Sequence, residues 1–152
     1  MLNRRTFIIA STVISCLAAG PSLAQDKELT ILSHKVHENV SRGLGSTTAG
    51  GDIAGEWAGE NGVSFNWITA DIEPLHDRLQ RELALSTSSI DVAFIINKFA
   101  TPRMSGLLSS LNAYVENEPI EEYEGIPADL IDGLTFDGKI FGIPFRHATV
   151  AM

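Results

Sequence analysis

Short segments with an ordered spacing of apolar and polar residues run along most of this chain. Three of them have the pattern of β-strands: residues 28–33, 63–68 and 90–96. In residues 63–68, Val63, Phe65 and Trp67 alternate with polar residues, which predicts one face more buried than the other. Residues 90–96 are almost continuously apolar, which is typical of a strand covered on both faces in a parallel sheet.

Helical spacing occurs between these strands. After Asp71, a predicted N-cap, apolar residues recur every three or four positions and predict a helix whose buried stripe is Ile72, Leu75, Leu79 and Leu83. Asp77 and Arg81 are four residues apart on its polar side, where they can pair weakly. A shorter helix is predicted over residues 52–61, ending at Gly62. The periodicity of that helix predicts that Trp57 packs in the core, as the strand pattern does for Trp67.

The other segments carry weaker patterns. Residues 34–51 are rich in His, Asn, Ser, Thr and Gly, which predicts a loop. Thr101 and Pro102 open a short predicted helix to about Leu108, and residues 111–115 can lie at a sheet edge. Residues 116–124 carry five glutamates, an arrangement more typical of a solvated acidic loop than of a calcium site. A further short helix is expected over residues 128–131.

A hairpin is the strongest local signal near the end of the sequence. Asp137-Gly138 lies between two short apolar runs, and this pair favours a two-residue turn with positive φ angles. The second arm is expected over residues 139–143, up to Pro144, which lacks an N–H group for continued pairing. An aromatic ring, a fixed cation and a titratable ring follow at Phe145, Arg146 and His147.

The order of these elements predicts the α/β class. Strands that alternate with helices form a mostly parallel sheet through right-handed crossovers, with helices on both faces. Ligands of such sheets bind beyond the carboxyl ends of the strands, near the point where the strand order reverses. Three segments are expected there: residues 34–51, residues 97–100 and residues 145–147.

Residues 1–24 have the anatomy of a signal peptide. Arg4 and Arg5 precede an apolar run over residues 7–19, and Ser22-Leu23-Ala24 forms a small-x-small cleavage site. We therefore expect export to the periplasm and one domain over residues 25–152. The leader fits general secretion or, through its two arginines, the twin-arginine route. Lipid attachment at Cys16 is less favoured, because the apolar run before it would be very short.

Charge and cysteine content exclude several classes of function. The chain has a formal net charge of −8, and without the leader nine basic residues remain against 19 acidic ones. Such a chain has no electrostatic surface for nucleic acid or anionic lipid. Cys16 is the only cysteine, so the exported part has no disulfide and no thiolate metal site.

His34 and His37 are the candidates for metal chemistry. Three residues apart, they would lie on one side of a helix, but Glu38 is outside the pair and no third ligand is evident. Hydrogen bonding to a ligand, or plain surface placement, is favoured over zinc. No nucleophile elbow or paired-carboxylate motif occurs, so an enzyme is the minority hypothesis. Phe99 and Phe145 follow strand ends, where aromatic rings can stack on a ligand.

The chain also resembles a known family. The ELTILS, DVAFIINKF and LNAYVEN segments and the closing PADLIDGLTFDGKIFGIPFRHAT stretch, together with the leader, are similar to the N-terminal part of extracellular solute-binding proteins of bacterial ABC importers, sugar-binding type. The resemblance implies the type II periplasmic binding protein fold, with a solute held between two lobes. It implies a monomer that has no cofactor, no nucleic-acid partner and no catalytic activity, and that binds a small solute and delivers it to a membrane permease. The residues that it implies as ligand-facing are His34, His37, Asn97, Phe99, Arg146 and His147.

One difference from the family concerns length. Members are much longer, so the resemblance implies a partial first lobe, from a fragment or an interrupted gene. A partial lobe is expected to expose apolar surface and to bind its solute weakly. The alternatives are a small exported metal-dependent hydrolase that uses His34, His37 and His147, or a product without activity.

Overall fold

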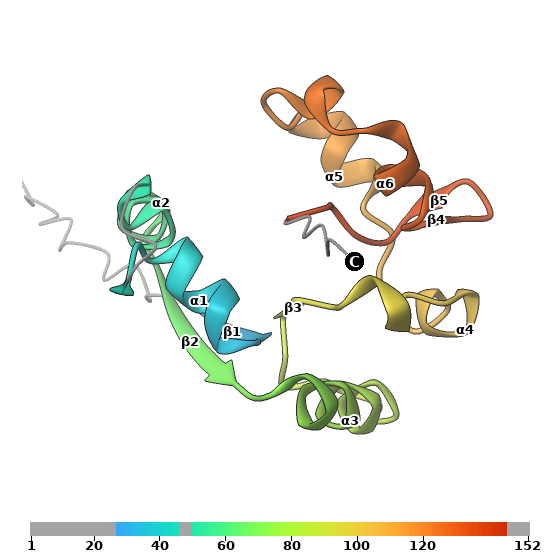
Figure 1. The fold of residues 1–152 in the computed structure, drawn as a ribbon, viewed down its shortest axis with the longest axis horizontal. Coiled ribbons are helices and arrows are strands. Elements are labelled where there is room, and N and C mark those ends of the chain that lie inside the picture. The colour runs from blue at the N-terminus through green and yellow to red at the C-terminus, as the bar shows by residue number, and fades with distance from the viewer. Residues whose placement is uncertain (1–26, 46–49, 146–152) are drawn as a thin grey trace, which may run out of the picture.

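A three-stranded parallel sheet and a separate small antiparallel hairpin form the β-structure of this α/β chain (Figure 1). The computed structural model describes residues 27–45 and 50–145. The predicted signal peptide, Arg146 and His147 lie outside these ranges. At this level the expected class is confirmed: a mixed α/β chain with a parallel sheet. None of the helices in the described ranges is both long and apolar enough to cross a bilayer.

The central strand of the sheet is β1, Lys27–Ser33, which pairs with β2, Val63–Thr69, on one side and with β3, Val92–Ala93, on the other. Ile31 lies opposite Trp67 in β2 and Val92 in β3. The chain therefore passes from β1 to one neighbour and then crosses to the other side. The order β2-β1-β3 places the point of reversal between the carboxyl ends of β1 and β3.

Strand β3 is shorter than predicted, because only two residues of the expected 90–96 segment are in the ladder. The Thr30 N–H of β1 donates to the Asp91 carboxylate (N···Oδ2 2.8 Å). At the start of the pairing between β1 and β3, the acceptor is therefore a side chain and not a backbone carbonyl. Phe94 still donates to the Leu32 carbonyl at 2.9 Å beyond the last paired residue. Val92 is 46% exposed, so the expectation of cover on both faces was wrong. In the described part of the chain, β3 is an edge strand with one neighbour.

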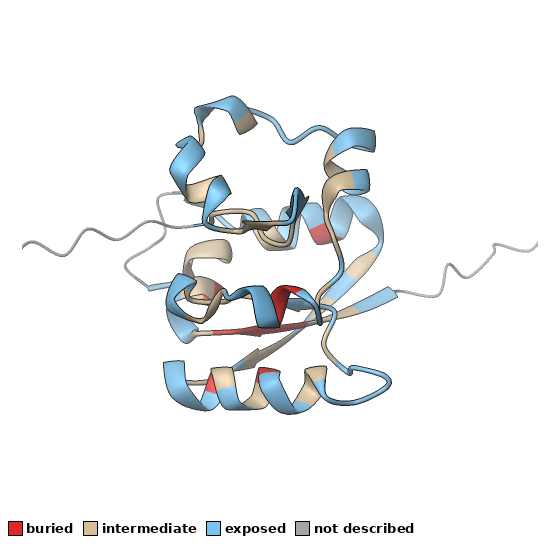
Figure 2. Cartoon of the chain, turned by 90° about the vertical axis from the view of Figure 1, so that its right-hand side faces the viewer, coloured by how far each residue is buried: buried red, intermediate tan, exposed pale blue. Residues whose placement is uncertain are grey.

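One face of the sheet packs against α3, Ile72–Leu83. Leu75 and Leu79 of this helix form the buried core with Leu32 of β1 and Met104 of α4, Pro102–Ser105. In Figure 2 the buried residues gather along the middle strand and on the helices packed against it. The predicted stripe is thus confirmed at its centre, although its first residue, Ile72, is exposed.

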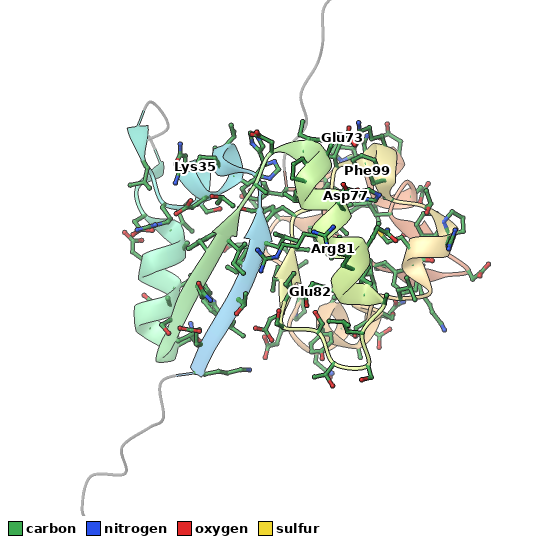
Figure 3. All side chains as sticks on the ribbon, turned by 90° about the horizontal axis from the view of Figure 1, so that it is seen from below. Lys35, Glu73, Asp77, Arg81, Glu82 and Phe99 are labelled. Atoms are coloured by element: carbon green, nitrogen blue, oxygen red, sulfur yellow. The ribbon has the colours of Figure 1, made fainter. Side chains whose placement is uncertain are left out.

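The polar side of α3 departs from the sequence expectation in two details. Asp71 is at the N-cap position, but its side chain makes no capping hydrogen bond. Asp77 and Arg81 form no ion pair in the described part of the chain (Figure 3). On an exposed helix surface such a pair is worth only a few tenths of a kcal/mol, about the entropy of ordering two long side chains. Figure 3 shows Glu73 and Phe99 close together at one end of the helix.

Two helices lie on the other face of the sheet. One is α1, Lys35–Ser41, in the segment that was predicted as a loop. That prediction was wrong because contacts within the helix stabilise it: His34 accepts a capping hydrogen bond from the Val36 N–H, and Glu38 pairs with basic residues on both sides. The other is α2, Ile53–Asn61, which confirms the predicted helix and ends at Gly62 with a left-handed φ of 60°.

The remaining helices are short. They are α5, Asn112–Asn117, and α6, Ala128–Asp132, with the short 3-10 helices η2, Asn97–Phe99, and η3, Tyr123–Gly125. Of these, η2 lies against α3 through the stacking of Phe99 on His76. Helix α5 occupies the segment expected at a sheet edge, so that expectation was wrong. The α6 prediction is confirmed, and α4 is shorter than predicted because it ends at Ser105. Figure 1 shows α5, α6 and the hairpin grouped together, away from α2.

The hairpin consists of β4, Thr135–Phe136, and β5, Lys139–Ile140, joined by the expected turn. Asp137 and Gly138 have φ angles of 50° and 72°, the two positive values of a primed turn. The second strand ends earlier than expected, at Ile140. Asn112 of α5 holds this arm: its Oδ1 accepts from the Ile140 N–H at 2.9 Å, and its Nδ2 donates to the Gly138 carbonyl at 3.3 Å.

Candidate functional site

Four rings meet beyond the carboxyl ends of β1 and β3: His34, His37, Phe94 and Phe145, called here the ring cluster. His37 stacks on Phe94 with ring centroids 5.1 Å apart and meets Phe145 edge-on at 5.8 Å. Phe94 and Phe145 are in edge contact at 4.8 Å, and His34 meets His37 at 6.1 Å. These separations are those of favourable aromatic pairs. The cluster lies where ligands of parallel sheets bind.

Different parts of the chain supply the four rings. His34 follows the last residue of β1 and caps α1, and His37 is one turn further along that helix. Phe94 follows β3, and Phe145 arrives after the hairpin. The hairpin and its contact with Asn112 therefore determine where the fourth ring is delivered. More than a hundred residues separate His34 from Phe145, so only the tertiary fold brings them together.

A line of aromatic contacts continues from the ring cluster across the same face of the sheet. Phe94 stacks with Trp67 of β2 at 6.3 Å, so the two rings reach over β1, which lies between their strands. Trp67 contacts Phe65 at 6.1 Å, and Phe65 stacks on Trp57 of α2 at 5.8 Å. Trp57 is 47% exposed, so the expectation that it packs in the core was wrong, whereas Trp67 is partly buried.

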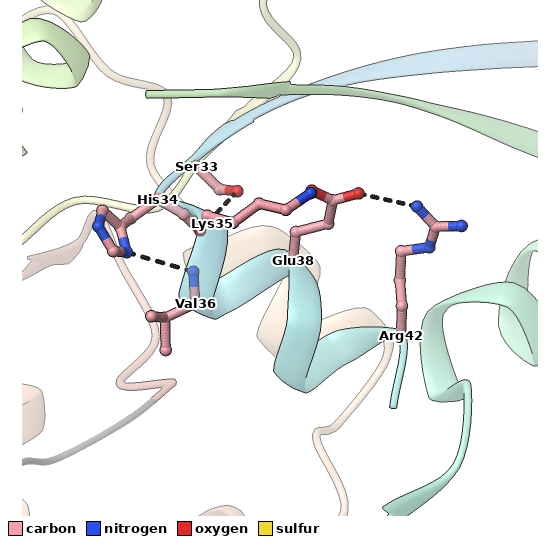
Figure 4. A network of polar contacts seen from close by, with 6 residues as sticks. All are labelled: Ser33, His34, Lys35, Val36, Glu38 and Arg42. Carbon is pink, nitrogen blue, oxygen red and sulfur yellow. Dashed lines mark hydrogen bonds and ion pairs between the residues drawn. The ribbon is translucent and has the colours of Figure 1, made fainter. Parts of the chain in front are cut away.

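A buried carboxylate holds α1 in place beside the cluster (Figure 4). The Glu38 side chain is 7% exposed and accepts from Lys35 Nζ at 2.9 Å and from an Arg42 guanidinium nitrogen at 2.8 Å. The hydrogen bond from Lys35 is the main cause that lowers the pKa of Glu38 below its ordinary value, and Arg42 adds to it against the opposing effect of burial. The same helix carries His34 at its cap and His37 in its first turn, so this network positions both rings.

A shallow pocket of about 450 Å³ opens next to His34. Its other walls are residues 71–74, at the start of α3, and Lys98 of η2. Lys98 Nζ forms an ion pair with Glu73 at 2.9 Å. The pocket places carboxylates, an ammonium group and an imidazole at the edge of the sheet where the strand order reverses. Such groups can donate to and accept from a polar solute.

The structure brings together three of the residues predicted as ligand-facing and separates two others from them. His34, His37 and Phe145 are in the ring cluster. Asn97 is exposed in η2, and Phe99 stacks on His76 of α3 at 3.7 Å and packs against the core on the opposite face of the sheet. Arg146 and His147 lie outside the described residues, so their predicted roles stay predictions.

The zinc hypothesis requires His34, His37 and His147 to lie together. No group of three residues suited to hold a metal ion occurs in residues 27–45 and 50–145. His34 Nδ1 accepts the hydrogen bond from the Val36 N–H at 3.2 Å, which leaves the other ring nitrogen for a ligand. His147, the third histidine of that hypothesis, is outside the described ranges, so the hypothesis stays a prediction.

Sequence reasoning missed two residues that shape the site. Phe94 lies in a continuous apolar run, which hides the face to which it belongs. The signal that could have found it is strand alternation, which puts Phe94 with Val92 on the face opposite to Ala93. Asn112 looked like an ordinary polar residue; a Ser-x-Asn spacing before a helix is too common to indicate that it would hold a hairpin.

No protein-family model matches this chain, and no match was found among curated proteins.

Proposed function

We propose that this chain is the exported, non-catalytic solute-binding component of an ABC importer, and that it binds a small polar solute, such as a sugar, at the ring cluster. The observation that supports the proposal is the meeting of His34, His37 and Phe145 with Phe94 beyond the carboxyl ends of β1 and β3. Three distant segments contribute to one place, and that place is the edge of the sheet where α/β folds bind ligands.

The chemistry of the cluster suits a sugar-like solute. Aromatic faces can cover the apolar side of a sugar ring, while imidazole nitrogens and the groups of the adjacent pocket can bond to its hydroxyls. Phe145 is 47% exposed and Phe94 is partly buried, so both rings keep surface for a ligand. We further propose that a second wall closes over this open side, as in the type II periplasmic binding fold, of which residues 25–152 would form part of the first lobe.

The remaining parts of the proposal follow from the leader and from the absence of enzymatic motifs. The signal-peptide pattern in residues 1–24 supports a periplasmic location, and the permease of the importer would be the protein partner. Helices on both faces of a parallel sheet in the order β2-β1-β3 are compatible with a binding-protein lobe.

Binding is best tested by NMR, which detects weak association. The exported chain is titrated with a panel of sugars, polyols and small peptides to millimolar concentrations while the His37 ring and Trp67 indole signals are followed. We expect at least one solute to shift both signals saturably, and the Phe145→Ala variant to weaken that response. The matched control is Phe136→Ala, which removes a hairpin ring whose contact is with Phe141. A panel that leaves the His37 and Trp67 signals unmoved would reject the proposed site.

Metal analysis separates this proposal from the hydrolase alternative. Protein purified without added chelator is expected to contain no stoichiometric zinc. Zinc at one equivalent that is lost in the His34→Ala variant would replace the binding-protein proposal with a metal-dependent enzyme.

A further inference from the structure

A second pocket, of about 350 Å³, lies between α3 and α4 on the face of the sheet away from the ring cluster. Its polar lining comes from three elements: His76 and Gln80 of α3, Lys98 of η2, and Thr101 and Arg103 around the start of α4. Phe99 forms an aromatic wall. We propose that this pocket binds a small anion that carries a phosphate or carboxylate group; of its lining residues, only Lys98 also lines the pocket beside His34.

The local charge of the pocket is opposite to that of the chain. The sequence has 19 acidic and 11 basic residues, yet none of the residues that line this pocket is acidic. Two fixed cations and an imidazole face one cavity, and they come from elements separated along the chain. A pocket of this charge attracts anions, and its shape limits their size.

The basic groups are available for a ligand. Arg103 forms no ion pair with an acidic residue in the described part of the chain. Lys98 pairs with Glu73, but the two side chains are 55% and 69% exposed, and an ion pair this exposed contributes little. Lys98 can therefore turn to a bound anion at small cost.

The imidazole of His76 is held in position. It stacks on Phe99 with centroids 3.7 Å apart and an interplanar angle of 11°, and Lys98 Nζ lies 4.5 Å from the centroid of Phe99. His76 Nδ1 is buried and has no hydrogen-bond partner in the described part of the chain. Because this nitrogen is closed to solvent and unbonded within the described residues, stacking on Phe99 is the contact that fixes the ring.

These groups supply the usual means of recognising an anion. The planar guanidinium of Arg103 can donate two parallel hydrogen bonds to a phosphate or carboxylate, and Lys98 adds a compact charge. The Gln80 amide offers a further donor, while the Thr101 hydroxyl already accepts from the Met104 N–H at 3.4 Å. This ligand chemistry differs from the aromatic stacking proposed at the ring cluster.

The test is an NMR titration of the exported chain with inorganic phosphate, with succinate and with chloride, at matched ionic strength. We expect saturable shifts of the His76 ring and of the Thr101 and Arg103 amides with phosphate, with succinate or with both, and none with chloride. Shifts with phosphate alone would assign phosphate-bearing ligands, and shifts with succinate alone would assign carboxylates. The Trp67 indole on the opposite face should not respond.

Variants locate the site. Arg103→Gln is expected to weaken anion binding by roughly tenfold, because it removes one charge-assisted hydrogen bond. Lys98→Gln is expected to weaken anion binding as well. Arg81→Gln, which removes the same charge from α3 outside the pocket, should bind as the parent chain does. Unfolding curves of each variant check that it is folded. Equal shifts with chloride, or unchanged affinity in both pocket variants, would overturn the proposal.

Discussion

The two faces of the parallel sheet differ in the side chains that cover them. Under α3 the buried side chains are not aromatic: Leu32, Leu75, Leu79 and Met104 are each at most 4% exposed, and Phe99 packs at their margin. Under α1 and α2 the contacts are aromatic, and the rings are only partly buried. The same strands supply both faces, because successive side chains of a strand point to opposite sides. One face thus stabilises the chain, and the other keeps apolar rings accessible for the proposed ligand.

This difference has a physical cause in the shape of the side chains. Branched aliphatic residues interdigitate and exclude water, so they make a closed core. Flat rings in edge and stacked contact leave their outer faces open, and exposed apolar side chains are indeed found in the described chain: Ile53, Trp57, Leu85, Leu107, Tyr114 and Phe145. The first two belong to α2, on the aromatic side of the sheet. Single exposed apolar residues are common on folded chains, so the expected exposed surface of a partial lobe stays a prediction.

The largest expected effect is on the aliphatic face. Replacing Leu79 with Ala leaves a cavity beside Leu32 and Leu75 and should lower the free energy of unfolding by about 2–4 kcal/mol. Urea unfolding followed by circular dichroism measures the change. The control is Leu85→Ala, at a leucine that is 59% exposed, which should change stability by less than about 0.5 kcal/mol. Equal losses in the two variants would contradict the assignment of the core to this face.

A smaller loss is expected on the aromatic face. Phe94→Leu keeps an apolar side chain but removes ring contacts with His37, Trp67 and Phe145, and should cost about 1–2 kcal/mol. The change should also alter tryptophan fluorescence, because Trp67 loses its stacked neighbour. Val92→Ala, at the exposed neighbour in β3, serves as the control and should have less effect than about 0.5 kcal/mol. A loss as large as that of Leu79→Ala would show that the two faces contribute equally.

The buried carboxylate on α1 gives a pH-dependent contribution. Because the pKa of Glu38 is lower in the folded chain, its stabilisation is fully present above the ordinary glutamate pKa of about 4.3 and is lost as pH falls through the lowered value. Glu38→Gln should cost about 1 kcal/mol at neutral pH, because it removes the charge from two ion pairs with partly exposed basic side chains, and this difference should shrink in acid. Unfolding curves at several pH values measure it. Glu60→Gln, at an exposed residue of α2, is the control. A difference between Glu38→Gln and the parent chain that grows in acid would contradict the direction of the shift.

The smallest effect is a stabilisation. Gly59 lies inside α2, has no positive φ, and an added Cβ would meet no atom within 4 Å. Gly59→Ala should therefore raise the free energy of unfolding by about 0.5–1 kcal/mol through helix propensity. Gly138→Ala, at a residue with φ of 72°, should instead destabilise the hairpin by about 1 kcal/mol. Thermal unfolding compares the two. Destabilisation by Gly59→Ala would contradict the open surroundings of Gly59.

Local patterns predicted a large part of the fold. The sequence alone predicts the Asp137-Gly138 turn, the Leu75 and Leu79 stripe and the glycine end of α2, because each depends on the conformational limits of a few neighbouring residues. The extent of β3 was not evident: where the strand begins, the Asp91 carboxylate accepts from the Thr30 N–H, and no local pattern shows a contact between such distant residues. Helix α1 was missed because its stabilising contacts, centred on Glu38, are side-chain pairs in a segment of loop-like composition.

The candidate site shows the same division. From the sequence alone, the strand ends marked residues 34–51, 97–100 and 145–147 as neighbours of a ligand, since the carboxyl ends of parallel strands share one edge. The family resemblance singled out His34 and His37 within the first of these segments. Only the tertiary structure decided that Phe94 joins them, that Phe99 turns to the opposite face against His76, and that Trp57 remains exposed. Local chemistry limits the conformations of each segment, whereas contacts between segments more than twenty residues apart determine which side chains face one another.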